Sequence, residues 1–167
     1  MTGREGALRA LADSEAPERA QALALFHRRH RASPWLLDKW FAAQAASTRE
    51  DTIEAAPRLL AHPDFTLAHP GRLGAVMEAF TGNLHAFHHP SGRGYAFVAD
   101  VVLAAARIDP QAAARMARHL AGWRRLEPGR AEKMKAQLER IAATPGVSAA
   151  LAGSAAPQTG ATRALAH

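Results

Sequence analysis

Histidine is the residue type of this sequence that most readily suggests chemistry, because nine histidines occur in 167 residues. His27 and His30 are three positions apart, which would place both imidazoles on one face of a helix. Their segment, FHRRHR, contains no carboxylate, and its arginines would repel a cation. His85, His88 and His89 lie in LHAFHHP, again without Asp, Glu or Cys close by, and match no standard zinc spacing. We therefore expect structural or solvated histidines and no metal or other cofactor bound by this chain.

Sequence motifs for catalysis are absent as well. The chain contains no H-E-x-x-H, no G-x-S-x-G, no G-x-x-x-x-G-K-[ST] and no G-x-G-x-x-G. It also has no cysteine, which excludes disulfides, thiolate ligands and a cysteine nucleophile. Glu50, Asp51 and Glu54 cluster at an expected helix start, where carboxylates complement the positive end of the helix dipole. The sequence therefore predicts no enzyme activity for this chain by itself.

Polar side chains are aligned on one predicted helix near residues 110–122. Gln111, Arg115, Arg118 and His119 follow i, i+4, i+7 and i+8 spacing, so they fall along one side of that helix. Gly122 is expected to end the helix. This side is a candidate surface for an anion.

The charge balance is basic, with 21 Lys and Arg against 15 Asp and Glu and a formal net charge of +6. Such a balance is compatible with an acidic partner, but the two signs are mostly interspersed, as on a solvated surface. Trp123 beside Arg124 and Arg125 resembles a base-stacking platform, yet proteins that bind single strands usually place several aromatics along a groove. We expect Trp123 to be a packing anchor and no nucleic-acid partner.

No segment has the pattern of a targeting or membrane sequence. Charged residues are scattered through the opening MTGREGALRALADSEAPER, which leaves no apolar core for a signal peptide. No run reaches the roughly 18 to 20 apolar residues that a spanning helix needs. We expect a cytoplasmic protein with no membrane partner.

Apolar residues recur at helical spacing through most of the chain, and no segment has the alternation of a strand. Prolines that suit the first turn of a helix follow Ala16, Ser33, His69, Asp109 and Glu127, and Ser33 and Asp109 are good N-caps. Pro57 should kink one helix. The polar segment TGNLHAFHHPSG is expected to be a loop. The predicted helices cover residues 3–13, 17–31, 34–46, 49–61, 70–80, 92–107, 110–122 and 128–143.

The spacing of these helices predicts an all-α fold, an α-solenoid of about eight antiparallel helices. The proline starts at 34, 70 and 110 are separated by the length of a helix pair in HEAT and armadillo arrays. With 48% hydrophobic residues, one such domain can bury a core. We expect the solenoid domain to span residues 1–145. Residues 146–167 are rich in Ala and Gly and are expected to form a loosely ordered tail.

The segment RASPWLLDKWF looks at first like a site, since Asp38 and Lys39 lie between two tryptophans. Leu37, Trp40 and Phe41 follow helical spacing, and a broad apolar face with aromatics is more typical of core. Asp38 lies near the expected helix start, where its charge complements the dipole. We therefore expect Trp40 to be a core anchor.

The order of several segments resembles the C-terminal helical domain of bacterial aminopeptidase N, a zinc-dependent alanyl aminopeptidase. The matching segments are LLDKWFAAQAAS, LLAHPDFTLAHPGRLGAVMEAFTGN, AFHHPSGRGYAFVADVVL, IDPQAAARM and RAEKMKAQLERI. Their DKWF, HPxF and SGxGY elements occur in the family's order, within about residues 1 to 143. Many members carry an arginine where this chain has Gly74, and most end in a further amphipathic helix.

The resemblance implies a non-catalytic domain that caps the zinc active site and lines the substrate chamber. In that family the zinc ligands and the G-A-M-E-N segment belong to a catalytic domain that this chain lacks, which would be its partner. Gln111 and Arg115, in DPQAAAR, match polar positions of a helix that faces the chamber, where they would meet the carboxyl side of a peptide substrate. The alternative hypothesis is an independent α-solenoid adaptor that binds a protein or an acidic partner.

Overall fold

The computed structural model describes residues 2–147, and helices make up most of them. Nine α-helices, one 3₁₀-helix and no strand lie within this range, so the predicted all-α class is confirmed. In chain order the elements are α1 (Thr2–Asp13), α2 (Arg19–His30), α3 (Pro34–Ala45), α4 (Thr52–Leu60), α5 (Pro70–Gly82), α6 (Leu84–Phe87), α7 (Arg93–Ala105), α8 (Pro110–Ala117), the 3₁₀-helix η1 (Arg118–Arg125) and α9 (Pro128–Ala143).

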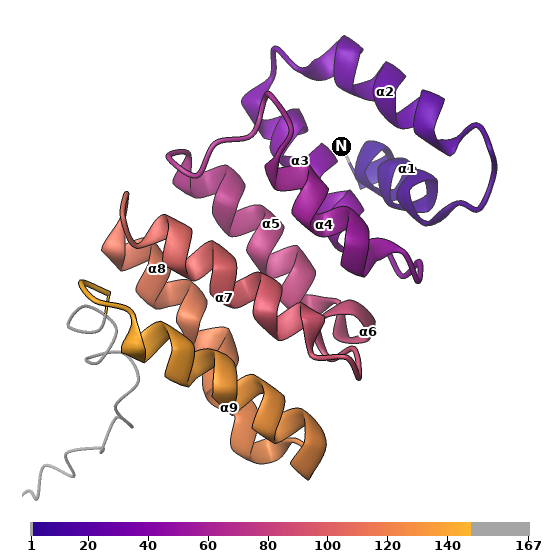
Figure 1. Ribbon diagram of the computed structural model, residues 1–167. Coiled ribbons are helices and arrows are strands. Elements are labelled where there is room, and N and C mark those ends of the chain that lie inside the picture. Colours follow the sequence, from indigo (N-terminus) through magenta and orange to yellow (C-terminus); the bar gives the residue numbers. More distant parts are fainter. Residues whose placement is uncertain (1, 148–167) are drawn as a thin grey trace, which may run out of the picture.

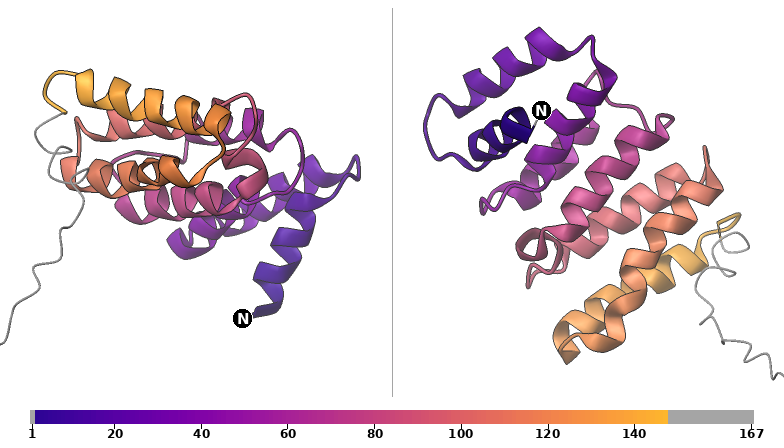
Figure 2. Two further views of the ribbon diagram at one scale, coloured as in Figure 1. Left: turned by 90° about the horizontal axis from the view of Figure 1, so that it is seen from below. Right: turned by 180° about the vertical axis from the view of Figure 1, so that it is seen from behind.

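The helices stack in two layers, as an α-solenoid does (Figure 1). One layer holds α1, α3, α5 and α8, in which each helix packs against the next. The other layer holds α2, α4, α7 and α9, with α7 packed against both α4 and α9. The views from below and from behind in Figure 2 show the same two layers. The predicted solenoid is therefore confirmed for the described residues. From residue 148 onward, the predicted tail lies outside the described residues.

Prolines begin four of the helices, as the sequence predicts. Pro34, Pro70, Pro110 and Pro128 each occupy the first helical position, where a missing N–H breaks no hydrogen bond. The prediction at Pro17 is wrong: α2 begins at Arg19, because the preceding residues form a turn in which the Arg19 N–H donates to the Ala16 carbonyl over 3.0 Å.

Side-chain capping follows the prediction at only one of two positions. The Asp109 carboxylate accepts from the Ala112 N–H over 3.0 Å, as an N-cap should. Ser33 occupies the N-cap position of α3, but its side chain makes no capping hydrogen bond. Glu127, which was not expected to cap, accepts from the backbone N–H groups of Gly129 and Arg130 at 2.7 and 2.8 Å.

The expected loop TGNLHAFHHPSG contains the short helix α6, which the sequence analysis missed. Asn83 caps it, since its Oδ1 accepts from the Ala86 N–H over 3.3 Å. The same amide donates to the Ser47 carbonyl over 2.6 Å, in the segment after α3. This short helix is therefore positioned by a contact between distant segments.

The predicted helix 110–122 is divided in the structure. It changes at Arg118 to the 3₁₀-helix η1, which passes through Gly122 and ends at Arg125. A 3₁₀-helix places residues i and i+3 on one side. Leu120 is fully buried, and Trp123 is packed against the same core. The tighter helix thus directs both side chains inward, and the expected packing role of Trp123 is confirmed.

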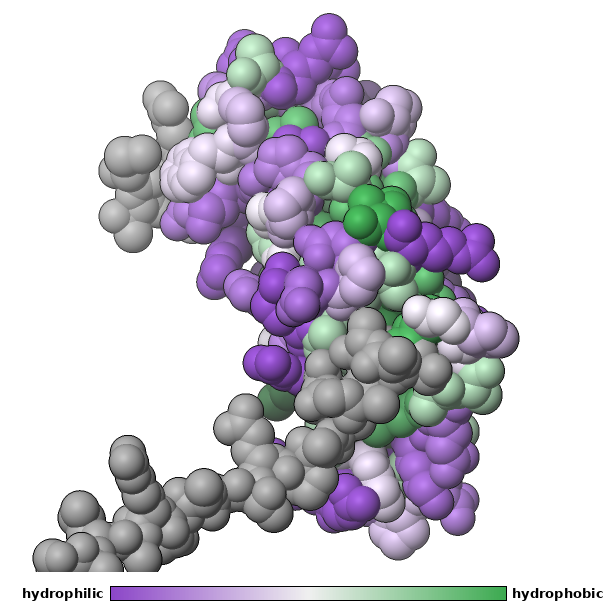
Figure 3. Space-filling model, turned by 90° about the vertical axis from the view of Figure 1, so that its left-hand side faces the viewer, coloured by the Kyte–Doolittle hydropathy of each residue, from purple (hydrophilic) through white to green (hydrophobic). Residues whose placement is uncertain are grey.

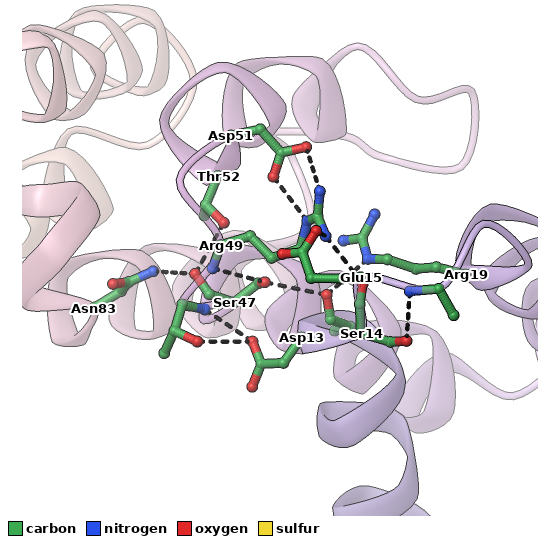
Figure 4. A network of polar contacts seen from close by, with 12 residues as sticks. Asp13, Ser14, Glu15, Arg19, Ser47, Arg49, Asp51, Thr52 and Asn83 are labelled. Atoms are coloured by element: carbon green, nitrogen blue, oxygen red, sulfur yellow. Dashed lines mark hydrogen bonds and ion pairs between the residues drawn. The ribbon is translucent and has the colours of Figure 1, made fainter.

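Three polar side chains, those of Ser47, Thr52 and Asn83, link the first three helix pairs of the array, which are α1 with α2, α3 with α4, and α5 with α7 (Figure 4). Ser47 donates its hydroxyl to the Ala12 carbonyl over 3.1 Å. The Ser47 carbonyl accepts from the Thr52 hydroxyl at 2.9 Å and from the Asn83 amide at 2.6 Å. All three polar side chains are buried. Hydrogen bonds therefore compensate the removal of these groups from water.

Asp38 has a further role that the sequence analysis missed. Its Oδ1 accepts from Arg72 Nε over 2.7 Å, and the Arg72 side chain is only 9% exposed. Arg72 also donates from Nη1 to the Asp64 carbonyl over 2.6 Å, and its guanidinium lies 5.7 Å from the centroid of the Phe41 ring. The helix-dipole interpretation of Asp38 did not include this role, in which its carboxylate neutralises a buried arginine.

Within residues 2–147, no helix combines the length and apolar character needed to cross a membrane.

Trp40 is a core residue, as predicted, and its substitution should be costly. It is 7% exposed, and its indole N–H donates to the Leu23 carbonyl over 2.9 Å. We expect Trp40→Ala to lower the free energy of unfolding by about 3 to 5 kcal/mol, as large-to-small core changes do. Urea unfolding followed by circular dichroism measures this. Trp35, which is 45% exposed, is the matched control, and its change to Ala should cost less than about 1 kcal/mol. Equal losses would contradict the assignment.

Gly94 is required by a close approach of two backbone segments. A Cβ at this position would overlap the carbonyl oxygens of Ala86 and Phe87, which belong to α6 and cannot move as a flexible side chain can. We expect Gly94→Ala to destabilise the fold by about 2 to 3 kcal/mol. Gly74, also helical, has open space around such a Cβ, so Gly74→Ala should stay within about 1 kcal/mol of the unmodified chain. Thermal unfolding of both variants compares them directly.

Candidate functional site

The layer formed by α1, α3, α5 and α8 is the concave side of the molecule. Figure 3 shows the molecule in profile, with an outline that is hollowed along this layer. Two depressions lie on it, one between α5 and α8 and one among α1, α3 and α5. Small residues line part of both, from α5 and α8 in the first and from α3 and α5 in the second, and they leave room between the helices.

The depression between α5 and α8 is the candidate site, with a volume of about 390 Å³. Its apolar wall includes Leu73, Met77 and Met116. Three polar side chains line it as well: Glu78, Arg115 and His119. It thus combines an apolar surface with one cationic, one anionic and one titratable group, which suits a ligand with both charged and apolar parts.

Arg115 and Gln111, the two predicted site residues, lie one turn apart on α8, and both are exposed. Arg115 lines the depression, whereas Gln111 is not among its lining residues. Arg118 is exposed but also lies outside it, while His119 lines it. The four polar side chains were expected on one side of a continuous α-helix. Their alignment is only partly preserved, because the chain changes to the 3₁₀-helix η1 at Arg118.

Glu78 is the functional candidate that the sequence analysis missed. It lies on α5, and both depressions are lined by it. Burial lowers the pKa of His119, and the negative charge of Glu78 opposes this shift by raising that pKa. No spacing along the chain indicated this pairing, because it depends on how α5 packs beside α8.

The second depression has a volume of about 470 Å³ and a rim of mixed charge. Glu5, Arg9 and Asp13 reach it from α1, and Lys39 reaches it from α3. Lys39 Nζ and Glu5 Oε1 form an ion pair of 2.9 Å across this space. The exposed pair is weak, so it leaves both side chains able to reorient.

Two of the three histidines of LHAFHHP have hydrogen-bond partners, and the third, His85, is exposed. His88 Nδ1 is 2.8 Å from the Tyr95 hydroxyl, and His89 Nδ1 is 2.8 Å from the Ser91 hydroxyl. Burial and, to a smaller extent, the charge of Arg130 lower the pKa of His88, so its neutral form is favoured. These contacts agree with the predicted structural role.

His27 differs from the prediction, because the fold gives it a carboxylate neighbour. Its Nε2 lies 2.6 Å from Asp64 Oδ2, and His62 lies beside both. Among the described residues, His27, His62 and Asp64 are the one group of three whose potential metal-ligand atoms all lie within 4.8 Å of one another. Sequence spacing missed the group because Asp64 is separated from His27 by 37 positions.

Trp123 is already occupied by cations of its own chain. The Arg124 guanidinium carbon lies 4.4 Å from its ring centroid, and Lys135 Nζ lies 5.6 Å away. Both cations approach the ring within the range of a cation–π contact.

Comparison with known proteins identifies one matching family. Residues 1–156 match the family described as "Domain of unknown function (DUF3458_C) ARM repeats". The chain is 42% identical over 149 residues to a Caulobacter vibrioides protein named Aminopeptidase N, covering 89% of this chain and 17% of that protein. It is 32% identical over 142 residues to the Escherichia coli protein of the same name, covering 84% of this chain and 16% of that protein.

Among solved structures, the chain is similar to that of Legionella pneumophila aminopeptidase A in complex with aspartic acid. The TM-score is 0.83 at 27% sequence identity, over 92% of this chain and 18% of that chain. The chain thus spans about one sixth of the length of the curated relatives that it matches.

The effect of the Glu78 charge on the pKa of His119 can be tested by titration. We expect an NMR titration of the unmodified chain to place the His119 midpoint below the ordinary value for histidine, because burial disfavours the imidazolium. Glu78→Gln should lower the midpoint further, since it removes a negative charge that favours the imidazolium. Glu139→Gln, which removes a carboxylate that pairs with Lys135 outside the depression, should leave it unchanged. A midpoint insensitive to Glu78→Gln would contradict the arrangement.

Proposed function

Because the chain belongs to the DUF3458_C family of ARM-repeat domains, we propose that it is a non-catalytic helical domain of an aminopeptidase. In this proposal its concave layer of α1, α3, α5 and α8 caps the active site and lines the substrate chamber. The zinc ion and the residues that cleave the peptide bond belong to a catalytic domain, which is its partner. The similarity to segments of proteins named Aminopeptidase N supports the proposal.

The observation that carries the proposal is the position of Arg115. Exposed Arg115 lies on the concave layer and lines a depression that also has an apolar surface. A guanidinium presents a planar fork of donors, stays charged at all relevant pH values and binds a carboxylate through two hydrogen bonds. It therefore suits the free carboxyl end of a short peptide whose apolar side chains rest on Leu73, Met77 and Met116.

Glu78 and Gln111 complete this binding surface. Glu78 faces the same space as Arg115 and adds a negative charge, which attracts amino groups and basic side chains. Gln111 lies one turn before Arg115 and is exposed, so its amide can contact the peptide backbone. These residues bind and orient the peptide, and none of them takes part in bond cleavage.

Arg115→Ala should impair peptide substrates selectively in the enzyme that contains both this domain and its catalytic partner. We expect KM to rise about tenfold or more for a peptide with a free carboxyl end, because a charge-assisted hydrogen bond is lost. The KM for an amino-acid anilide, which has no such carboxylate, should change by less than about twofold. Arg118→Ala is the matched control, because Arg118 is exposed on the adjoining turn but outside the depression. Equal effects on the peptide and the anilide would contradict the role of Arg115.

The purified chain alone should not hydrolyse an amino-acid anilide, even with added zinc. When mixed with the catalytic domain, it should associate in a one-to-one complex, which sedimentation analysis can measure. Zinc-dependent turnover by the chain alone would overturn the non-catalytic assignment. Failure to associate would favour the independent adaptor instead.

A further inference from the structure

A group of two imidazoles and one carboxylate lies away from the two depressions, between α2 and the segment that follows α4. His27 is in the last turn of α2, whereas His62 and Asp64 belong to residues 61–69, between α4 and α5. Their potential ligand atoms all lie within 4.8 Å of one another. The group thus joins the first and second helix pairs through side chains of ligand type.

The three side chains already point toward one another. His27 Nε2 and Asp64 Oδ2 are 2.6 Å apart, and the ring centroids of His27 and His62 are 4.9 Å apart at an interplanar angle of 71°. His62 Nδ1 accepts from the Asp64 backbone N–H over 3.1 Å, so this nitrogen carries a lone pair. Each residue therefore offers one atom of the kind that binds a metal ion.

The surroundings hold these residues in place. The His62 ring packs against the rings of Trp40 and Phe41, at centroid distances of 5.3 and 5.5 Å. Arg72 Nη1 donates to the backbone carbonyl of Asp64 over 2.6 Å, which fixes the main chain beside the carboxylate. Contacts of this kind orient ligands and make a site less costly to form.

Asp64 supplies the negative charge that the segment FHRRHR lacks, and this charge favours a cation at the group. The nearest buried positive charge, Arg72, is neutralised by Asp38 at 2.7 Å. Burial, and then the neighbouring His27, lower the pKa of His62, while Asp64 raises it to a smaller extent. A neutral imidazole is the form that binds a metal ion. The His27 side chain is 14% exposed and that of Asp64 is 34% exposed, so an ion can reach the group from solvent.

We propose that His27, His62 and Asp64 form a binding site for a divalent transition-metal ion of the zinc type. Two histidines and one carboxylate are a common ligand set for Zn²⁺, and water completes a tetrahedron. When the ion binds Nε2 of neutral His27, the ring hydrogen moves from Nε2 to Nδ1; an imidazolium instead releases its Nε2 proton to water. The ligand atoms draw to about 3.3 Å from one another, as zinc–ligand distances near 2 Å require. The ion replaces the hydrogen bonds of Asp64 to His27 and His62 and links α2 to residues 61–69. This proposal is independent of the aminopeptidase assignment.

Calorimetric titration of the chain with Zn²⁺ tests the site. The 167-residue chain is used without a polyhistidine tag and after treatment with a chelator. We expect one ion per chain, with affinity reduced about tenfold or more in both Asp64→Asn and His62→Gln. The double variant His85→Gln with His89→Gln is the matched control, because these residues form another histidine pair, with ring centroids 6.5 Å apart. Its affinity should equal that of the unmodified chain.

Absence of binding, or affinity that the Asp64 and His62 variants leave unchanged, overturns the site. Loss of binding in the control variant also overturns it, because the ion would then occupy the other pair. A second measurement needs no variant of the group. In ¹⁵N NMR spectra of the unmodified chain, one equivalent of Zn²⁺ should shift the imidazole nitrogens of His27 and His62. Shifts confined to the other histidines would refute the proposal even if the variants fail to fold.

Discussion

The buried ion pair of Arg72 with Asp38 is the interaction on which much of the remaining structure depends. A guanidinium that is 9% exposed must be paired, because an uncompensated buried charge costs about 3 to 5 kcal/mol when its partner is removed. The pair joins α5 to α3, and the same guanidinium fixes the backbone of Asp64. It therefore sets how α3 and α5 lie on the concave layer. It also fixes the main chain of Asp64, whose carboxylate contacts His27.

Local chemistry made much of the fold predictable. Helical periodicity and four prolines at first helical positions indicated most of the helices, and their spacing indicated a solenoid. The misses share a physical cause. The short helix α6 depends on Asn83 reaching Ser47, and η1 depends on Leu120 and Trp123 turning toward the core. Neither contact follows from the residues adjacent to it in sequence.

The sequence predicted the site residues that lie on one helix, but not those that a second helix contributes. Arg115 and His119 were found because both lie on one predicted helix, and the structure places both in one depression. Glu78 completes that depression from α5, and Asp64 completes the histidine group from the segment after α4. Such pairings arise from packing between helices, which a single sequence does not specify by spacing. For Asp38, the dipole argument gave no indication of Arg72, which lies 34 positions away in sequence.

The Ser47 carbonyl has a consequence for how this array can change during evolution. In an ideal repeat protein, each unit contacts only its neighbours through similar interfaces, so units can be duplicated or deleted. Here one residue of the second pair donates to Ala12 of the first and accepts from Asn83 of the third. Deleting or inserting a single pair at this point would leave buried polar groups without partners, at a cost of about 1 to 3 kcal/mol for each group. The first three pairs are therefore expected to be inherited as one block of fixed length, with variation in repeat number confined to positions beyond it.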